Sequence, residues 1–267
     1  MDTESCETLR SISRYDWLRT DILTQCAEGN HGIVQSAVTT GVALDRGDGD
    51  GWNALILASQ NGHIETVRVL FDRELDVNSA TTEGLTSLHM AAQEGHMEVV
   101  NFLLERGADF DALANNGCSA LHLAANRGHL QVIEILIEWG STLDSFQTET
   151  GEGPVLSASR NGHLSVLALL LSYEQGLEQV NRAMTDGTTP LLAASLHGRH
   201  EVITLLLRKG ADLLHRRKDG KSALDLCLSR RHTEAEKILR ENLALGVIRD
   251  QREEVDEALV DEEDEYD

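Results

Sequence analysis

Eleven histidines and four cysteines are among the side chains of this 267-residue chain that could bind a metal ion or transfer protons. The cysteines, Cys6, Cys26, Cys118 and Cys227, lie far apart and form no Cys-x-x-Cys pair, so neither a zinc site nor a disulfide framework is indicated. No His-Glu-x-x-His motif places two imidazoles on one helix face. We therefore predict no metal site, and reduced thiols typical of the cytosol or nucleus.

Motifs for nucleophilic or phosphate chemistry are also missing. The sequence contains no Gly-x-Ser-x-Gly. Gly220-Lys221-Ser222 matches the end of a phosphate-binding loop but lacks the upstream glycine, so it is better explained as a hairpin followed by a helix cap. We predict that the chain is not an enzyme and binds no cofactor.

Four of the histidines follow a glycine at a regular interval. Gly-His occurs at Gly62, Gly95, Gly128 and Gly162, with spacings of 33, 33 and 34 residues. The same template places Gly29 and Gly198 at the glycine position, with Arg231 in place of the last glycine. Self-similarity at about 33 residues predicts a repeat protein.

Residues 83–112 show what one repeat contains. Thr86 can cap a first helix, and Gly95 can supply the left-handed residue that ends it. A second helix should follow and end before Gly107. It carries an apolar stripe formed by Val99, Val100, Leu103 and Leu104. Two short helices cannot bury both of their faces alone, so the stripe predicts a neighbouring copy stacked against each pair.

This order of residues resembles the ankyrin repeat. The resemblance covers about residues 21–243 in six or seven repeats, and it implies an all-α solenoid of stacked helix-turn-helix units with projecting hairpin loops. We expect residues 1–20 to form an N-terminal cap, with Tyr15, Trp17 and Leu18 covering the stack, and residues 244–267 to form an acidic, disordered tail. The fifth repeat, about residues 147–183, carries insertions that predict longer loops, and Pro190 fits a first helical position in the sixth.

Family membership would also assign roles to side chains. The repeat histidines would be structural, tying a helix to the next loop, and a protein partner would contact residues that flank the hairpin glycine or precede Gly-His. Carried onto this chain, these positions are Asp50, Trp52, Glu83, Leu85, Gln93, Glu94, Asn116, Cys118, Asn126, Arg127 and Arg160. Trp52 and Leu85 stand out as apolar anchors, although Trp52 could instead fold into the N-terminal core.

A formal net charge of −22 limits the partners. Residues 244–267 contain 11 Asp or Glu and two Arg, a net charge of −9, which leaves −13 for residues 1–243. Because both parts are acidic, a nucleic-acid-binding surface is disfavoured. The start of the chain lacks the pattern of a signal peptide, and no apolar run approaches the length of a membrane span, so we expect no membrane association.

A basic set near the last repeat contrasts with this charge. It comprises Arg216, Arg217, Lys218, Lys221 and Arg230. The set could be an ordinary solvated surface, or it could bind an acidic segment, either of a partner or of the chain's own residues 261–267. Such contacts would be weak and sensitive to salt.

Asn78 is a candidate modification site by resemblance. Some ankyrin proteins are substrates of an asparaginyl hydroxylase that prefers a leucine six residues before an acidic residue and an asparagine two residues after it. Leu70, Asp76 and Asn78 match this arrangement. The alternative is an unmodified hairpin asparagine.

The resemblance as a whole implies a non-catalytic scaffold or adaptor that binds a protein partner through the concave surface of the stack. We expect a monomer in the cytoplasm, the nucleus or both. One alternative is a nuclear regulator that binds basic tails or a transcription factor, and another is a ubiquitin-ligase substrate receptor. No motif identifies the partner.

Overall fold

The computed structural model describes residues 16–41, 44, 47–71 and 75–245. Within these ranges the chain is helical, with isolated β-bridges and no strands, so the predicted all-α fold is confirmed. The chain forms two compact units, unit 1 (Met1–Glu149) and unit 2 (Thr150–Asp267).

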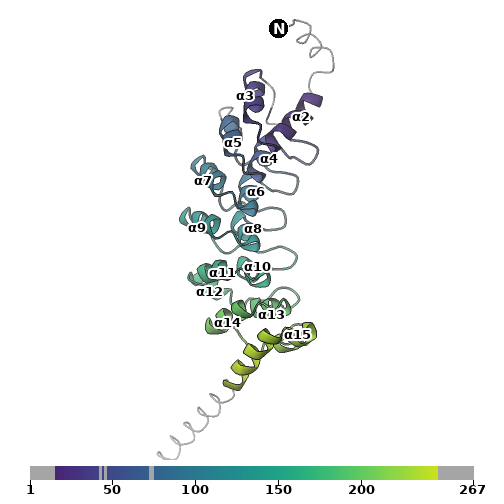
Figure 1. The fold of residues 1–267 in the computed structure, drawn as a ribbon, viewed down its shortest axis with the longest axis vertical. Coiled ribbons are helices and arrows are strands. Elements are labelled where there is room, and N and C mark those ends of the chain that lie inside the picture. Colours follow the sequence, from purple (N-terminus) through teal and green to yellow (C-terminus); the bar gives the residue numbers. More distant parts are fainter. Residues whose placement is uncertain (1–15, 42–43, 45–46, 72–74, 246–267) are drawn as a thin grey trace, which may run out of the picture. The chain divides into compact units, whose positions relative to one another are not determined.

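Unit 1 consists of helix pairs arranged in two layers (Figure 1). The first helices of the pairs are α2 (Asp16–Ala27), α4 (Ala54–Gln60), α6 (Ser87–Glu94) and α8 (Ala120–Arg127), each packed on the next. The second helices are α3 (His31–Thr39), α5 (Ile64–Phe71), α7 (Met97–Glu105) and α9 (Leu130–Glu138), which pack in the same order. The loops that lead into α4, α6 and α8 project beyond the first layer.

Side-chain caps begin the first helices as predicted. The Asn53 Oδ1 atom accepts a hydrogen bond of 2.9 Å from the Ile56 amide, and the Ser119 hydroxyl accepts one of 3.2 Å from the His122 amide. Thr86 caps α6 in the same way. Gly95 then ends α6 in the left-handed conformation, with φ of 82°.

The core of unit 1 lies between the two layers. Leu55, Leu88 and Leu121 on the first helices are at most 1% exposed, and so are Leu70 and Leu103 on the second helices. These residues are the apolar positions of the repeat, so the stripe that required a stacked neighbour in the sequence is buried against one.

The repeat histidines link neighbouring pairs. His96 Nε2 lies 2.9 Å from the Gln60 carbonyl oxygen, and His129 Nε2 lies 2.9 Å from that of Gln93. The ring of His96 also fills the space beside Gly62, where a Cβ atom would lie 2.5 Å from its Nδ1 atom. Their role is structural, but the bond runs to the preceding pair rather than to a following loop, because the ring lies against the glycine of that preceding pair.

Unit 2 repeats the two-layer arrangement with variations. Its first helices are α10 (Pro154–Asn161), α13 (Pro190–Leu196) and α15 (Ala223–Arg230), and α11 (Leu164–Leu170) and α14 (His200–Arg208) form the second layer. The predicted insertion in the fifth repeat contains a short additional helix, α12 (Glu174–Glu178). Pro190 occupies the first turn of α13 as expected.

The last glycine position of the template is filled by an arginine in a glycine-like conformation. Arg231 follows α15 with φ of 59°, and it is the one non-glycine residue of the described ranges that has a positive φ. Residues 233–245 then form the final helix. The ending of α15 therefore retains the geometry of the other repeats although its residue type differs.

The predicted boundaries of the repeat region differ from those of the helices. α2 begins at Asp16, inside the segment predicted as a cap, so the first helix starts upstream of residue 21, where the repeat pattern becomes recognisable in the sequence. The final helix continues to residue 245, two residues past the predicted boundary. Tyr15 and residues 246–267, including the predicted disordered tail, lie outside the described residues, as do the side chains of Trp17 and Leu18.

Candidate protein-binding surface

Backbone hydrogen bonds connect the projecting hairpins of unit 1. The Thr82 amide donates to the Asp50 carbonyl oxygen over 2.8 Å, and the Asn115 amide donates to that of Glu83 over 2.9 Å. Asn116 accepts the equivalent bond from Thr148, also at 2.9 Å. The main chain at these positions is therefore fixed, while the side chains of Asp50, Glu83 and Asn116 remain exposed.

Trp52 and Leu85 occupy equivalent positions on two neighbouring hairpins, and both are half-buried. Each is held by its main chain: the Trp52 amide donates to Asp48 Oδ1 over 2.9 Å, and the Leu85 amide donates to Thr81 Oγ1 over 3.2 Å. Cys118 is the next residue in this series, but it is only 1% exposed. Its small side chain lies inside the unit, so Cys118 cannot supply the partner contact that we expected from its position.

The predicted residues at the ends of the first helices lie in the same layer. Gln93 and Glu94 end α6, and the side-chain Nε2 atom of Gln93 donates to Glu94 Oε1 over 3.0 Å. Asn126 is half-buried and Arg127 is exposed at the end of α8. Since α6 and α8 pack directly on each other, the structure brings these four residues to neighbouring helix ends.

The hairpin residues and the helix-end residues lie at opposite ends of the first helices. Leu85 precedes α6 and Glu94 is its last residue, so an eight-residue helix of about 12 Å separates them. A partner that touches both must therefore extend along the first layer. Exposed carboxylates of Asp50, Glu83 and Glu94 make this part of unit 1 acidic.

Arg160 in unit 2 is engaged in an ion pair. Its Nη1 atom lies 2.6 Å from Glu152 Oε2, and the Glu152 side chain is only 4% exposed. The Ser157 hydroxyl donates to the other oxygen of the same carboxylate over 2.7 Å. The buried carboxylate is thus satisfied by two donors, which hold Arg160 in position at the end of α10.

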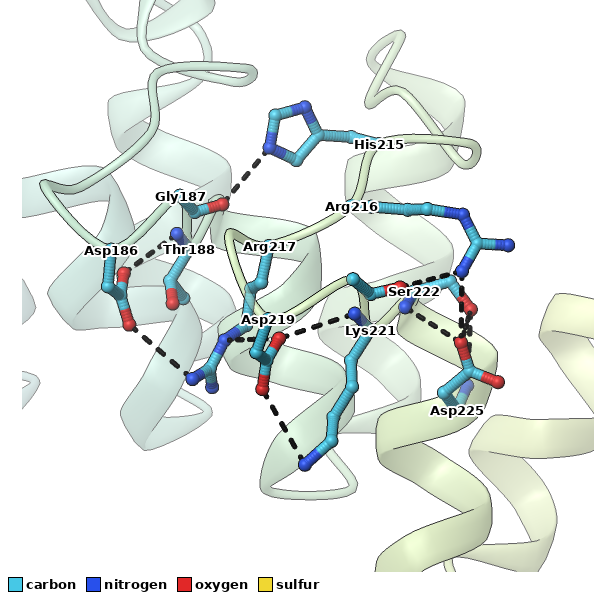
Figure 2. A network of polar contacts seen from close by, with 11 residues as sticks. Asp186, Gly187, Thr188, His215, Arg216, Arg217, Asp219, Lys221, Ser222 and Asp225 are labelled. Carbon is cyan, nitrogen blue, oxygen red and sulfur yellow. Dashed lines mark hydrogen bonds and ion pairs between the residues drawn. The ribbon is translucent and has the colours of Figure 1, made fainter.

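Most of the basic set predicted near the last repeat is paired with local carboxylates (Figure 2). Arg217 lies 3.8 Å from Asp186 and 3.5 Å from Asp219. Lys221 lies 3.6 Å from Asp219, and Arg216 lies 3.3 Å from Asp225.

Charge and hydrogen bonding in this network also act on the aspartates. Hydrogen bonds from Ser222, and the charge of Arg216, lower the pKa of Asp225. Desolvation raises the pKa of Asp186, but hydrogen bonds from Thr188 and the charge of Arg217 outweigh it and leave the pKa lowered. Asp186 and Asp225 therefore stay ionised at neutral pH, and much of the positive charge of the basic set is compensated locally.

Two cations of the basic set differ from the rest. Lys218 and Arg230 are exposed, and within residues 150–245 neither lies at ion-pair distance from a carboxylate. The docking of residues 261–267 on the set stays a prediction, because those residues lie outside the described ranges.

Asn78 is exposed in a loop of unit 1, and its amide is used in bonding to the next repeat. Its Oδ1 atom accepts a hydrogen bond of 2.8 Å from the Asp109 amide, and its Nδ2 atom lies 3.4 Å from the Gly107 carbonyl oxygen. Asn181 makes the same pair of contacts in unit 2, to Asp212 and Gly210. Asn78 therefore has a structural role, and its hydroxylation stays a prediction.

Buried thiols and imidazoles of the described residues belong to the packing. Burial raises the pKa of Cys26 to about 12 and that of Cys227 to about 11, so both remain protonated thiols. Burial is also the main cause of the lowered pKa of His89, whose ring is bonded to Thr86 and to the Cys118 carbonyl oxygen. Across the described ranges no three histidine, cysteine or acidic side chains are placed to hold a metal ion.

Sequence reasoning missed two groups of surface residues. Met97 and Trp139 in the second layer of unit 1 are 47% and 41% exposed, although the repeat pattern drew attention to the first layer. In unit 2, Arg199 follows Gly198 where other repeats have histidine. The arginine at this position is visible in the sequence, but the residues that surround Arg199 in the folded unit, such as Arg160, could not be predicted from it.

None of the helices among the described residues combines the length and hydropathy that crossing a membrane requires.

Comparison with known proteins gives a consistent family assignment. The family model for ankyrin repeats (three copies) matches residues 22–114, 108–181 and 155–247. Ankyrin repeat and SAM domain-containing protein 6 from Mus musculus is 35% identical over 78 residues, and its Rattus norvegicus counterpart is 36% identical over 78 residues. These matches cover 29% of this chain and 9% of either relative.

Solved structures resemble a much larger part of the chain. The human ASB11 ankyrin repeat domain matches with a TM-score of 0.72 and 28% identity, over 82% of this chain and 95% of that domain. The ankyrin repeat domain of Bcl-3, described as a unique member of the IkappaB protein family, matches with a TM-score of 0.64 and 27% identity. This match covers 82% of the present chain and 97% of the Bcl-3 domain. A chain of the Bdellovibrio bacteriovorus complex between the endopeptidase Bd0816 and immunity protein Bd3460 matches with a TM-score of 0.61 and 30% sequence identity. This match covers 70% of the present chain and 96% of the chain in that complex.

Proposed function

Because the chain belongs to the ankyrin repeat family, we propose that it is a non-catalytic adaptor whose protein partner binds the first layer of unit 1. The contact residues are Asp50, Trp52, Glu83 and Leu85 on the hairpins, with Gln93, Glu94, Asn126 and Arg127 at the helix ends. Asn116 continues the hairpin series, whereas the buried Cys118 is left out.

The observation that carries this proposal is the pair of half-buried apolar side chains on successive hairpins. Trp52 and Leu85 follow main-chain positions that the hydrogen bond between Thr82 and Asp50 holds together. A surface that is already ordered loses little conformational entropy when it binds. Apolar anchors in such places commonly contribute about 2 kcal/mol each to binding.

The charge of the surface limits the chemistry of the partner. Asp50, Glu83 and Glu94 are exposed carboxylates beside the apolar pair. A partner segment with an apolar anchor flanked by lysine or arginine complements them. This supports, as a second candidate, a nuclear regulator that binds basic tails, whereas no contact favours a ubiquitin-ligase substrate receptor.

Affinity capture with matched variants tests the binding surface. Trp52→Ala with Leu85→Ala should remove the partner from the captured proteins, because losing about 2 kcal/mol at each residue, about 4 kcal/mol together, weakens binding roughly 1,000-fold. The control carries Trp139→Ala with Met97→Ala, which truncates exposed apolar residues of the second layer. Circular dichroism of all variants verifies that the fold is retained.

The two sets of captured proteins decide the outcome. A protein held by the wild type and by the control, but lost by the first variant, is the partner that the proposal requires. If both variants capture the same proteins in the same amounts as the wild type, Trp52 and Leu85 do not belong to a binding surface. Fractionation of the cells that express the chain then separates a nuclear regulator from a cytoplasmic adaptor.

A further inference from the structure

Five cationic or titratable side chains gather at the ends of the first helices of unit 2. Arg160 lies near the end of α10, His197 follows α13, and Arg230 ends α15. Arg199 lies three residues beyond the end of α13 and His232 lies two residues beyond the end of α15, where the second helices start. We name these five residues the His197 cluster.

Direct contacts hold the His197 cluster together. Arg199 Nε donates to the Arg160 carbonyl oxygen over 3.2 Å, and His232 Nε2 lies 3.1 Å from the Leu196 carbonyl oxygen. The ring of His232 also lies against Gly198, where a Cβ atom would be 2.6 Å from its Nδ1 atom. His197, between Leu196 and Gly198, is thereby placed next to both contacts.

The electrostatic environment of His197 is positive. Its own desolvation, followed by the charges of Arg160, Arg199, Arg230 and His232, lowers the pKa of His197. These charges come from two first helices of unit 2, α10 and α15, and from the starts of two second helices. Glu152 compensates Arg160, but within residues 150–245 no carboxylate lies at ion-pair distance from Arg199 or Arg230.

Two comparisons within the chain make this concentration of charge distinctive. The equivalent helix ends of unit 1 carry one cation, Arg127, and otherwise neutral or acidic residues: Gln60, Asn61, Gln93, Glu94 and Asn126. The basic set near Arg217 is largely paired with aspartates, as described above. The His197 cluster is therefore the better site in unit 2 for an acidic segment.

The chain itself contains a segment of complementary charge. Residues 250–267 include 11 acidic residues and one arginine, a net charge of −10. They follow the helix 233–245, which starts beside His232 and is about 20 Å long. Eighteen extended residues can span about 60 Å, so segment 250–267 can reach back to the cluster.

We propose that residues 250–267 dock on the His197 cluster of unit 2 and shield it from acidic segments of other proteins. A tethered segment acts at an effective concentration of about millimolar, which allows weak ion pairs to keep the site occupied. This places the docking at Arg160, Arg199 and Arg230, a site that shares only Arg230 with the basic set predicted from the sequence. It does not depend on the proposed surface of unit 1.

The imidazole of His197 can report on the docking in the full-length chain. The imidazole resonance is assigned by its loss in His197→Gln, and its pKa is measured by NMR titration in low salt. The wild type is compared with a tail variant that carries Asp261→Asn, Glu262→Gln, Glu263→Gln and Asp264→Asn. Each carboxylate held about 7 Å away in water raises the pKa by about 0.4 units. The variant should therefore show a lower pKa, and 1 M salt should abolish the difference.

A matched control separates docking from net charge. Replacing Glu65, Glu98, Glu134 and Glu138 by glutamine removes the same number of charges from exposed positions of unit 1. This control should leave the pKa of His197 at the wild-type value. Equal pKa values in the wild type and the tail variant, or an equal shift in the control, would overturn the proposal. If added hexaglutamate raises the pKa equally in the wild type and the tail variant, the cluster takes a partner segment and the tail proposal fails.

Discussion

Gly95 is the position where the conformational and packing demands of the repeat can be measured separately. It ends α6 with φ of 82°, and a Cβ atom there would lie 2.5 Å from His129 Nδ1. In Gly95→Ala the left-handed backbone costs about 1–2 kcal/mol. Displacing the His129 ring breaks its 2.9 Å contact with the Gln93 carbonyl oxygen, which costs about 1 kcal/mol more. The free energy of unfolding should therefore fall by about 2–3 kcal/mol.

Gly107→Ala is the matched control, because it measures the cost of the left-handed backbone conformation alone. Gly107 has φ of 85°, but a Cβ atom there meets nothing within 4 Å. Urea unfolding followed by circular dichroism should give a loss of about 1–2 kcal/mol for this variant. The difference between the two variants measures the contact between glycine and histidine. Equal losses would refute the argument that the ring requires glycine at this position.

The remaining predictions concern α15 in unit 2. Arg231→Gly should raise the free energy of unfolding by about 0.5–1 kcal/mol, because glycine adopts the left-handed conformation without the strain of a side chain; a loss in urea unfolding would instead show that the Arg231 side chain makes a stabilising contact. Because hydrogen bonds from Ser222 lower the pKa of Asp225, its carboxylate stabilises the fold above the ordinary pKa of 3.8, and this is lost as the pH falls through the lowered pKa. Asp225→Asn should reduce stability by about 0.5–1 kcal/mol at neutral pH but not in strong acid, where an equal loss would contradict the assignment.

The elements of each repeat were predictable because they depend on local chemistry. Thr86, Asn53 and Ser119 accept hydrogen bonds at helix starts, and Gly95 takes the left-handed conformation at a helix end. These preferences arise within a few residues, and the 33-residue period repeats them. The all-α stack of helix pairs followed directly from that pattern.

The candidate binding surface was only partly predictable. The repeat template located Trp52 and Leu85 on equivalent hairpins, but it could not show that Cys118, in the same register, is buried. Burial depends on how a side chain's size fits neighbouring loops, which one repeat position does not encode. Met97 and Trp139 were missed for the complementary reason, since the template gives the second layer no role in binding.

The distribution of charge in unit 2 shows the same division. By itself, the sequence determined which residues are cationic and how far apart they lie along the chain. It also determined the repeating helix pairs, which stack on one another and carry these residues. Only the tertiary structure decided that Arg217 is paired with Asp186, and that Arg199 reaches the end of α10 beside His197. The physical reason is that helix caps and apolar stripes act over a few residues. The Arg217–Asp186 ion pair and the Arg199–Arg160 hydrogen bond instead join repeats more than 30 residues apart, and such partners are known only once those repeats are packed together.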